Sequence, residues 1–333
     1  MKREVIQPRN EEHWLQERAN DITSTEVAAL FGFSPYITKF ELWHRKKDKF
    51  EVEFKENERM KWGTRLQDSI AEGAAKDYGW KIRRMDEYIR IPKLRMGSSF
   101  DFSIEGQEEH KIDTKPGSVN KVYPAAYLNR EENIFIIDVG LLEIKNVDSL
   151  QFKEKWIENE DGEIEAPNHI EIQVQHQMAV SDRNYAYICV LVGGNTLYVI
   201  RRDRNENVIN MIFQKVAEFW KSIEDGIEPE PEIEKDYETI IKLNSLVDPG
   251  KIVDISSNEI CTQLATQYSE ASEKEKYYAG EKKQIKAQLM NLIGDSEKAI
   301  GNGYKISAGY IPEKFIDSFT RNGYRNFRLT MQK

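Results

Sequence analysis

The hydrophobic and polar positions of the chain alternate between helical and strand-like spacing. Residues 60–78 place apolar side chains four residues apart, which predicts an amphipathic helix. Residues 185–192 form a continuous apolar run, and a Gly-Gly pair separates it from a second strand-like run, which predicts a buried strand and its hairpin partner. Further helices are expected over 25–31, 169–180 and 208–223, and further strands over 87–91, 98–104, 134–144 and 196–201.

This order of elements predicts the fold class. A helix and a strand meander are followed by a helix, two strands and a last helix. Such an order is typical of an α/β fold with a mixed central sheet flanked by helices.

An acidic stretch divides the chain. Residues 222–238 carry eight acidic side chains and one lysine, and two prolines lie among them. Like charges repel and proline lacks a backbone donor, so an extended linker is expected. We therefore expect a large domain over 1–225, an acidic linker over 226–250, and a helical module with a short C-terminal hairpin over 251–333.

The helical module carries a heptad-like apolar stripe, formed by Leu264, Tyr268, Ala271, Tyr278, Ile285, Leu289 and Leu292. Glu275 and Lys282 interrupt this stripe. Because the seam is polar twice, the pattern favours a helical hairpin or a packed helix over a long coiled coil.

Composition and charge exclude several classes of protein. Aromatic residues make up 11% of the 333 residues, which is ample for a core and excludes a wholly disordered chain. No stretch approaches the ~20 apolar residues of a membrane helix, and the N-terminus has no apolar signal-peptide core. Two cysteines cannot form a four-thiolate metal site. These features favour a cytoplasmic protein without a membrane segment.

The net charge of −9 argues only weakly against a nucleic-acid partner. The acidic stretch alone contributes −7, which leaves −2 for the rest of the chain, and basic clusters occur elsewhere. Local sites therefore decide the function.

The strongest candidate chemistry lies at the ends of two apolar strands. Glu143 and Lys145 follow an apolar run and share one face of a strand, because positions two apart point the same way. Asp101 lies within a second apolar strand, where a carboxylate is costly unless it is paired or bound to a metal. Two carboxylates on neighbouring strands form a hard-oxygen site for Mg²⁺, and the lysine can stabilise charge in the transition state. Metal-assisted phosphodiester hydrolysis suits such a site. This is the PD-(D/E)xK nuclease arrangement, with Phe100 in place of the proline.

A second acid-x-lysine sequence, Asp113-Thr114-Lys115, has no apolar strand before it and is followed by Pro-Gly. A loop would not hold these two side chains as firmly as a strand would. We interpret residues 105–133 as a loop inserted between the two catalytic strands.

Several motifs occur in an order that resembles the YqaJ-like viral recombinases, which include the lambda-type alkaline exonucleases. The resemblance covers roughly residues 12–225. It rests on Trp14-Leu15-Gln16-Glu17-Arg18, Thr25-Glu26-Val27, Phe33-Ser34-Pro35-Tyr36, Trp62-Gly63-Thr64-Arg65-Leu66-Gln67, Ser99-Phe100-Asp101, Glu143-Ile144-Lys145 and Gln173-Val174-Gln175-His176-Gln177-Met178. Each piece alone is weak, but the ordered set is specific.

The resemblance implies an exonuclease that degrades one strand of double-stranded DNA from its 5′ end and leaves 3′ overhangs. It implies Mg²⁺, with Mn²⁺ as a substitute, held by Asp101, Glu143 and the backbone carbonyl of Ile144. It also implies a pocket for the 5′-phosphate, formed by Arg18, Thr25, Ser99 and Gln173. An arginine fork with hydroxyl and amide donors suits a phosphate group.

The implied partners are DNA ends and a single-strand annealing protein, in a bacterial cell or a phage-infected host. The family also includes toroidal trimers, so a homo-oligomer is expected.

Gln67 departs from the family pattern, because the family places a glutamate of the metal site there. A neutral amide binds Mg²⁺ through one oxygen at best, so Gln67 is a candidate ligand only in a weakened sense. This leaves open an alternative, a DNA-end-binding or scaffold protein of the same fold with weakened catalysis. A non-nucleic-acid enzyme with a chance Glu-x-Lys is a third interpretation, which the ordered motifs disfavour. His176 is interpreted as structural, and no proton-transfer role is assigned to it.

Overall fold

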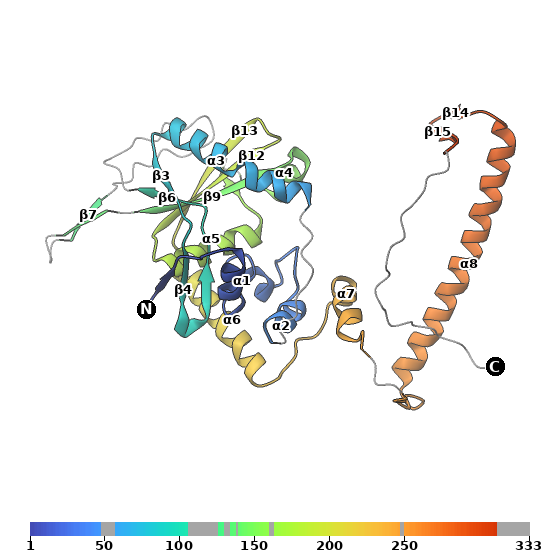
Figure 1. Ribbon diagram of the computed structural model, residues 1–333, viewed down its shortest axis with the longest axis horizontal. Coiled ribbons are helices and arrows are strands. Elements are labelled where there is room, and N and C mark those ends of the chain that lie inside the picture. The colour runs from blue at the N-terminus through green and yellow to red at the C-terminus, as the bar shows by residue number, and fades with distance from the viewer. Residues whose placement is uncertain are drawn as a thin grey trace. The chain divides into compact units, whose positions relative to one another are not determined.

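The computed structural model describes residues 1–47, 57–105, 126–129, 134–137, 139–159, 163–246 and 250–311. The chain forms two compact units, residues 1–237 and residues 238–333 (Figure 1). The candidate site residues all lie in the first unit.

A five-stranded mixed sheet forms the centre of the first unit. Its order is β13 (Thr196–Asp203), β12 (Tyr185–Val192), β9 (Gly140–Val147), β6 (Phe102–Glu105) and β3 (Lys81–Arg84). β9 and β12 are parallel, whereas the other neighbours are antiparallel. The parallel pair requires a crossover, which contains α4 (Ser149–Lys155) and α5 (Asn168–Ser181).

The hairpin between β12 and β13 confirms the expectation from the Gly-Gly pair. Gly193 and Gly194 have φ angles of 60° and 77°, values that residues with a Cβ rarely adopt. The tight turn aligns the two strands along their full length.

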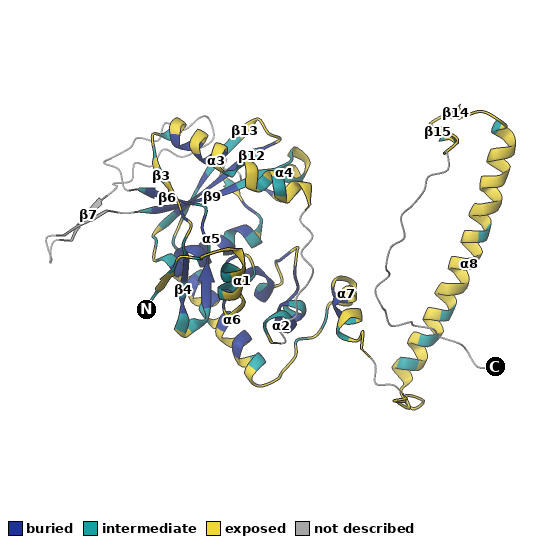
Figure 2. Ribbon diagram, viewed as in Figure 1, coloured by how far each residue is buried: buried dark blue, intermediate teal, exposed yellow. Residues whose placement is uncertain are grey.

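Helices cover both faces of the sheet, as the ribbon shows (Figure 1). On one face α3 (Glu58–Tyr78) packs Ile70, Ala71 and Ala74 against Phe102 and Leu142. On the other face α5 and α6 (Glu206–Glu224) contribute to the larger apolar core, which appears dark blue in Figure 2. The expected α/β fold with a mixed sheet between helices is confirmed.

The second sheet of this unit has the order β1 (Glu4–Ile6), β4 (Tyr88–Ile91), β5 (Met96–Ser98) and β2 (Ile22–Thr23). Four short helices lie next to these strands along the chain. They are α1 (Glu11–Ala19), the 3₁₀-helix η1 (Val27–Phe31), α2 (Lys39–Lys47) and the 3₁₀-helix η2 (Pro92–Leu94). The helix expected over 25–31 is thus a short 3₁₀-helix, which ends at Gly32 with φ 72°.

Two expected strands are interrupted. The strand expected over 98–104 stops at Ser98 and resumes at Phe102, while the strand expected over 134–144 is divided into β8 (Ile134–Ile137) and β9. β8 pairs with β7 (Ala126–Asn129), so the segment interpreted as a loop over 105–133 contains a strand. Asp113-Thr114-Lys115 lies outside the described residues.

The acidic stretch also differs from the expected extended linker, because it contains α7 (Ile233–Leu243). Asp236 is fully buried, accepts a hydrogen bond from Thr38 Oγ1 at 2.5 Å, and accepts another from the backbone N–H of Glu232 at 2.7 Å. These bonds stabilise the first turn of α7 after the two prolines.

In the second unit α8 (Glu259–Ile293) is one continuous helix, so the helical hairpin considered from the sequence is wrong. The strand pair β14 (Lys298–Gly301) and β15 (Tyr304–Ser307) follows it and confirms the expected C-terminal hairpin.

Two further short strands of the first unit, β10 (Ile157–Glu158) and β11 (Ile164–Glu165), pair between α4 and α5. Across the described ranges, no helix combines the length and the apolar content needed to span a lipid bilayer.

His176 links α5 to the second sheet. Its side chain is fully buried, and Nε2 lies 3.2 Å from the carbonyl oxygen of Ile22, to which it donates. Burial lowers the pKa of His176 to about 4, so the ring is neutral at pH 7. Its place in the core supports the structural role expected from the sequence.

We expect the free energy of unfolding to fall as the pH drops from about 6.5 to about 4. In this window the unfolded chain binds a proton at His176 that the folded chain excludes, so stability present above pH 6.5 is progressively lost. The loss from this group is roughly 3 kcal/mol at the acid end. Urea unfolding of the wild type and of His176→Gln at several pH values measures it. Identical pH slopes in the two proteins would contradict a neutral, buried His176.

Candidate active site

The candidate site forms where two strands of the central sheet separate. The pairing of β6 with β9 ends at Phe102 and Leu142. One residue beyond this pair, Asp101 accepts a hydrogen bond at 2.8 Å from the backbone N–H of Ile144 to its Oδ2. The carboxylate therefore takes the place of a strand partner, and the separation opens room for side chains.

Glu143 is the most firmly held of the candidate residues. It is 5% exposed, and its Oε1 accepts hydrogen bonds from Lys145 Nζ at 2.5 Å and from Gln173 Nε2 at 2.6 Å. Its Oε2 accepts a third from Gln177 Nε2 at 2.8 Å. A buried carboxylate needs such donors to offset its lost hydration.

The two glutamines belong to α5 and lie four residues apart, so they share one face of the helix. Gln175 points elsewhere, since its amide bonds the carbonyl of Asp203 and the N–H of Asn205. The sequence interpretation included Gln173 and omitted Gln177. The i, i+4 spacing within the same motif is the signal that could have identified Gln177.

The two carboxylates and the lysine perturb one another. Burial, and then the neighbouring Glu143, raise the pKa of Asp101 to about 7, although Lys145 and hydrogen bonds from Ile144 and Gln67 oppose the shift. Burial alone would lower the pKa of Lys145, but Glu143 and Asp101 outweigh it and raise that pKa. Lys145 is therefore a cation at neutral pH, and the site keeps excess negative potential beside Asp101.

Gln67 lies at this site. It is partly buried on α3, and its amide lies close enough to Asp101 to lower the pKa of that carboxyl. The next residue, Asp68, is exposed and pairs with Arg84 instead. An amide thus contacts Asp101 where the family pattern has a carboxylate.

The donor set fits a hard divalent cation. Asp101 and Glu143 supply carboxylates, and the nearby Gln67 is neutral and lowers the pKa of Asp101 as a donor. The carbonyl of Ile144 points to the same side of β9 as its N–H, toward Asp101, as strand geometry requires. Within the described ranges, no three His, Cys, Asp or Glu side chains gather as a metal site. Two carboxylates completed by neutral oxygens are typical of Mg²⁺ rather than of zinc.

A second cluster contains three of the residues predicted to bind phosphate. Arg18 Nη2 donates to Thr25 Oγ1 at 3.4 Å, and the guanidinium lies 4.3 Å from the centroid of the Trp14 ring. Trp14 Nε1 donates to Ser99 Oγ at 2.8 Å, and Ser99 precedes Asp101 by two residues. Arg18 and Ser99 thus contact the same indole, and Thr25 joins the cluster through Arg18.

Gln173, the fourth of these residues, is placed differently. The hydrogen bonds described for it join Glu143 and Lys145, the latter from Nζ to its Oε1 at 3.3 Å. Gln173 therefore belongs to the carboxylate cluster in this structure.

Buried charges fix the backbone beneath Arg18. Lys46 Nζ donates to the carbonyl oxygens of Arg18 at 3.0 Å and Asp21 at 2.7 Å, and pairs with Glu26 at 2.9 Å. Burial would raise the pKa of Glu26, but Lys46 and Arg18 hold it below its usual value. Lys46 thus holds the Arg18 backbone while the Arg18 side chain donates to the exposed Thr25.

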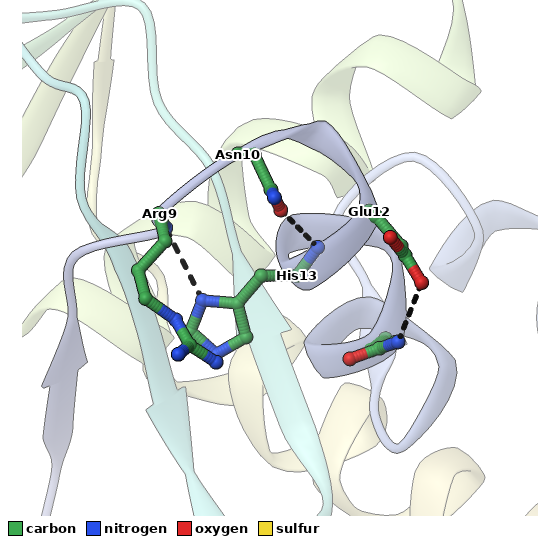
Figure 3. Close-up of a pocket in the computed structure, with 5 residues that line it drawn as sticks. Arg9, Asn10, Glu12 and His13 are labelled. Carbon is green, nitrogen blue, oxygen red and sulfur yellow. Dashed lines mark hydrogen bonds between the residues drawn. The ribbon is translucent and has the colours of Figure 1, made fainter.

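A separate hollow lies at the start of α1 (Figure 3). Its lining consists of Arg9, Asn10, Glu12, His13 and Gln16. Asn10 caps the helix by accepting from the N–H of His13 at 2.9 Å. The hollow shares no lining residue with the carboxylate cluster, so we interpret these contacts as fixing the start of the helix that carries Trp14 and Arg18.

Comparisons with known proteins agree with the motif order. Residues 13–184 match the model of the YqaJ-like viral recombinase domain. A Bacillus subtilis (strain 168) protein, described as "Uncharacterized protein YqaJ", is 28% identical over 211 residues, which are 63% of this chain and 55% of that protein. The match thus spans about half the length of this relative.

Two solved structures are also similar. An alkaline exonuclease (LHK-Exo) from Laribacter hongkongensis has a TM-score of 0.45 and 19% identity, over 70% of this chain and 99% of that chain. A phage-related exonuclease from Haemophilus somnus 129PT has a TM-score of 0.39 and 12% identity, over 62% and 95%.

Gln67→Glu should increase the stabilisation that Mg²⁺ gives the protein. A third carboxylate beside Asp101 adds repulsion without metal and an anionic ligand with metal, so Tm should fall in EDTA and rise in saturating Mg²⁺. A tenfold gain in affinity corresponds to about 1.4 kcal/mol, or roughly 2–4 °C. Thermal unfolding with EDTA and with Mg²⁺ measures the difference.

Ser69→Glu is the matched control, because it adds the same charge at an exposed position of α3. If both variants respond equally to Mg²⁺, Gln67 does not face the cation.

Proposed function

Because this chain belongs to the YqaJ-like viral recombinase family, we propose that it is a metal-dependent exonuclease that degrades one strand of duplex DNA from the 5′ end. The single observation that carries the proposal is the meeting of Asp101, Glu143 and Lys145 where β6 and β9 separate. This is the arrangement of the PD-(D/E)xK nucleases. The names of the similar solved structures, an alkaline exonuclease and a phage-related exonuclease, agree with it.

Each residue has a proposed role in the hydrolysis. Mg²⁺, or Mn²⁺ in its place, held by Asp101, Glu143 and the Ile144 carbonyl, would polarise the scissile phosphate and lower the pKa of the attacking water. Lys145 is a partly buried cation rather than a base, so it stabilises the charge that develops on the phosphorus centre. Gln173 and Gln177 hold Glu143 in one orientation, which keeps its oxygens directed into the site.

The cluster around Trp14 is proposed to bind the 5′-phosphate. Arg18 supplies a fork of donors, and the hydroxyls of Thr25 and Ser99 complete the pocket. Ser99 precedes Asp101 by only two residues. A 5′-phosphate bound at Ser99 would therefore place the scissile bond near the carboxylates. Gln173 is also proposed to contact DNA from its place beside Lys145.

Digestion from the 5′ end would leave a 3′ single-stranded overhang, the substrate of a single-strand annealing protein. We propose such a protein as the partner, in the cytoplasm of a bacterial or phage-infected cell. We further propose that the nuclease unit assembles into a homo-oligomer, with a trimer as the expected form.

Gln67 favours a second candidate function. A neutral amide at Asp101 removes one anionic ligand from the proposed site, so metal binding and turnover would both weaken. The protein would then bind DNA ends through the Arg18 cluster and act as a scaffold.

Substitutions in the carboxylate cluster test the first proposal. Asp101→Ala or Glu143→Ala should abolish digestion of linear duplex DNA in Mg²⁺ while DNA binding survives, because each removes a ligand but leaves the Arg18 cluster. Lys145→Ala should lower the rate by roughly 10²–10³-fold. Digestion is followed on end-labelled duplexes with Mg²⁺, with Mn²⁺ and with EDTA.

Asp113→Ala is the control and should cost little activity. Full activity in Asp101→Ala or Glu143→Ala would overturn the assignment. A wild type that binds ends without digesting them would favour the scaffold function.

The proposed phosphate pocket predicts a preference for one kind of DNA end. A 5′-phosphorylated duplex should be digested about tenfold faster or more than a 5′-hydroxyl duplex, since hydrogen bonds to a charged group contribute about 1.5–3 kcal/mol. Arg18→Ala should erase most of this difference. The initial rates on both duplexes give the ratio for each protein.

Arg9→Ala is a matched control, because Arg9 lies before α1 and lines a hollow that contains none of Trp14, Arg18, Thr25 or Ser99. It should keep the wild-type ratio. Equal rates on the two ends in the wild type would mean that the pocket does not read the phosphate.

A further inference from the structure

α8 is a long helix that buries none of its side chains in the second unit. It begins after Asn258, whose side chain accepts from the N–H of Cys261 at 3.0 Å, and it ends at Gly294. Its 35 residues correspond to about 52 Å. An isolated helix gains stability mainly by packing an apolar face, and α8 packs none within the described part of its unit.

The unpacked face is a regular stripe. Steps of four and three residues connect Leu264, Tyr268, Ala271, Glu275, Tyr278, Lys282, Ile285, Leu289 and Leu292, and Cys261 precedes them at the same spacing. Leu264 is 58% exposed, Tyr278 63% and Leu292 80%. A repeat of 3.5 residues sustained over 32 residues, from Cys261 to Leu292, is the pattern by which one helix pairs with another.

The charges of α8 are segregated along its length. Residues 259–276 carry four acidic and two basic side chains, whereas residues 277–293 carry one acidic and three basic side chains. Acidic side chains near the N-terminus and basic side chains near the C-terminus also interact favourably with the helix dipole, but the dipole does not explain the apolar stripe. Two parallel copies would place like charges together, including Glu275 beside Glu275 and Lys282 beside Lys282. Two antiparallel copies place the acidic half of each beside the basic half of the other.

One antiparallel register aligns the stripe over its full length. With the two-fold axis midway between Glu275 and Tyr278, each layer joins a first and a fourth heptad position. Leu264 then meets Leu289, Tyr268 meets Ile285, and Cys261 meets Leu292 of the second copy. Lys282 meets the small Ala271, and Glu275 meets the Tyr278 hydroxyl. Glu275 and Lys282 therefore each avoid a residue of like charge in the second copy.

We infer that α8 is a dimerisation helix whose partner is α8 of a second copy of this chain, in antiparallel orientation. The pair is isologous, so the same stripe serves both copies. This contact goes beyond the nuclease chemistry, and it holds whether or not the chain degrades DNA. Each dimer would join two nuclease units through their C-terminal modules.

Cysteine cross-linking in the full chain tests the register. In the inferred dimer Cys261 lies opposite residue 292, while the two Cys261 residues are about 46 Å apart. Leu292→Cys should therefore give a covalent dimer on mild oxidation, and the wild type should not. Cys189 is fully buried and is common to every variant. Because the cross-link reads which residues meet, it reports on α8 regardless of any assembly of the nuclease unit.

Two controls separate register from chance collision. Ile285→Cys displaces the new thiol by seven residues, or about 10 Å along the axis, and should cross-link several-fold less. Leu292→Cys combined with Cys261→Ser should not cross-link. A disulfide between two Cys261 residues in the wild type would show a parallel pair and overturn the inference. No preferential cross-link with Leu292→Cys would overturn it as well.

Charge reversal provides an independent test in the Leu292→Cys background. Glu270→Lys, Glu273→Lys and Glu275→Lys together make both halves of α8 basic, while Lys282→Glu, Lys283→Glu and Lys286→Glu together make both halves acidic. Either set alone should reduce cross-linking several-fold at low salt. A mixture of the two proteins, or all six changes in one chain, should restore it. If all six changes in one chain fail to restore it, charge complementarity does not orient the pair.

Discussion

The buried carboxylate of Glu143 is the constraint on which the first unit depends. A carboxylate removed from water is costly unless charge and hydrogen bonds replace its hydration. Lys145 comes from the same strand, but Gln173 and Gln177 come from α5, within the crossover that connects β9 to β12. Satisfying Glu143 therefore fixes α5 against the central sheet. The same helix places His176 against Ile22 of β2, in the second sheet, and Thr25 and Ser99 of the Arg18 cluster follow β2 and β5 of that sheet.

The regular elements were largely predictable, because burial on one face imposes a period that the sequence displays. α3, α5, α6 and the β12–β13 hairpin lie within a few residues of their expected bounds. The exceptions have local causes. The stretch from Val27 to Phe31 is too short for a full α-helix and winds as a 3₁₀-helix. α7 forms despite its charge, because Asp236 bonds the first turn and Thr38, a contact nearly 200 residues away in sequence.

The site was predictable in its residue types but less so in its geometry. Asp101, Glu143 and Lys145 stand out because charged groups are unexpected in apolar strands. The break after Ser98, and the bond from the Ile144 N–H to Asp101, depend on how two strands separate, and no local period encodes that. Gln177 was missed because a glutamine on a helix is usually solvated. The four-residue spacing from Gln173 was the one signal for it in the sequence, and the position of Glu143 shows why its amide is needed.

The order in which the chain is synthesised has a consequence for the cell. Arg3 donates to the carbonyl of Val180 at 2.8 Å and pairs with Asp182, and Glu143 needs glutamines that follow it by 30 and 34 residues. A ribosome-bound chain that has exposed only its first 150 residues holds all the carboxylates of the site without the helix that orients them. Such contacts of large sequence separation form late. A nascent or prematurely terminated chain would therefore lack the ordered carboxylate cluster until α5 has emerged.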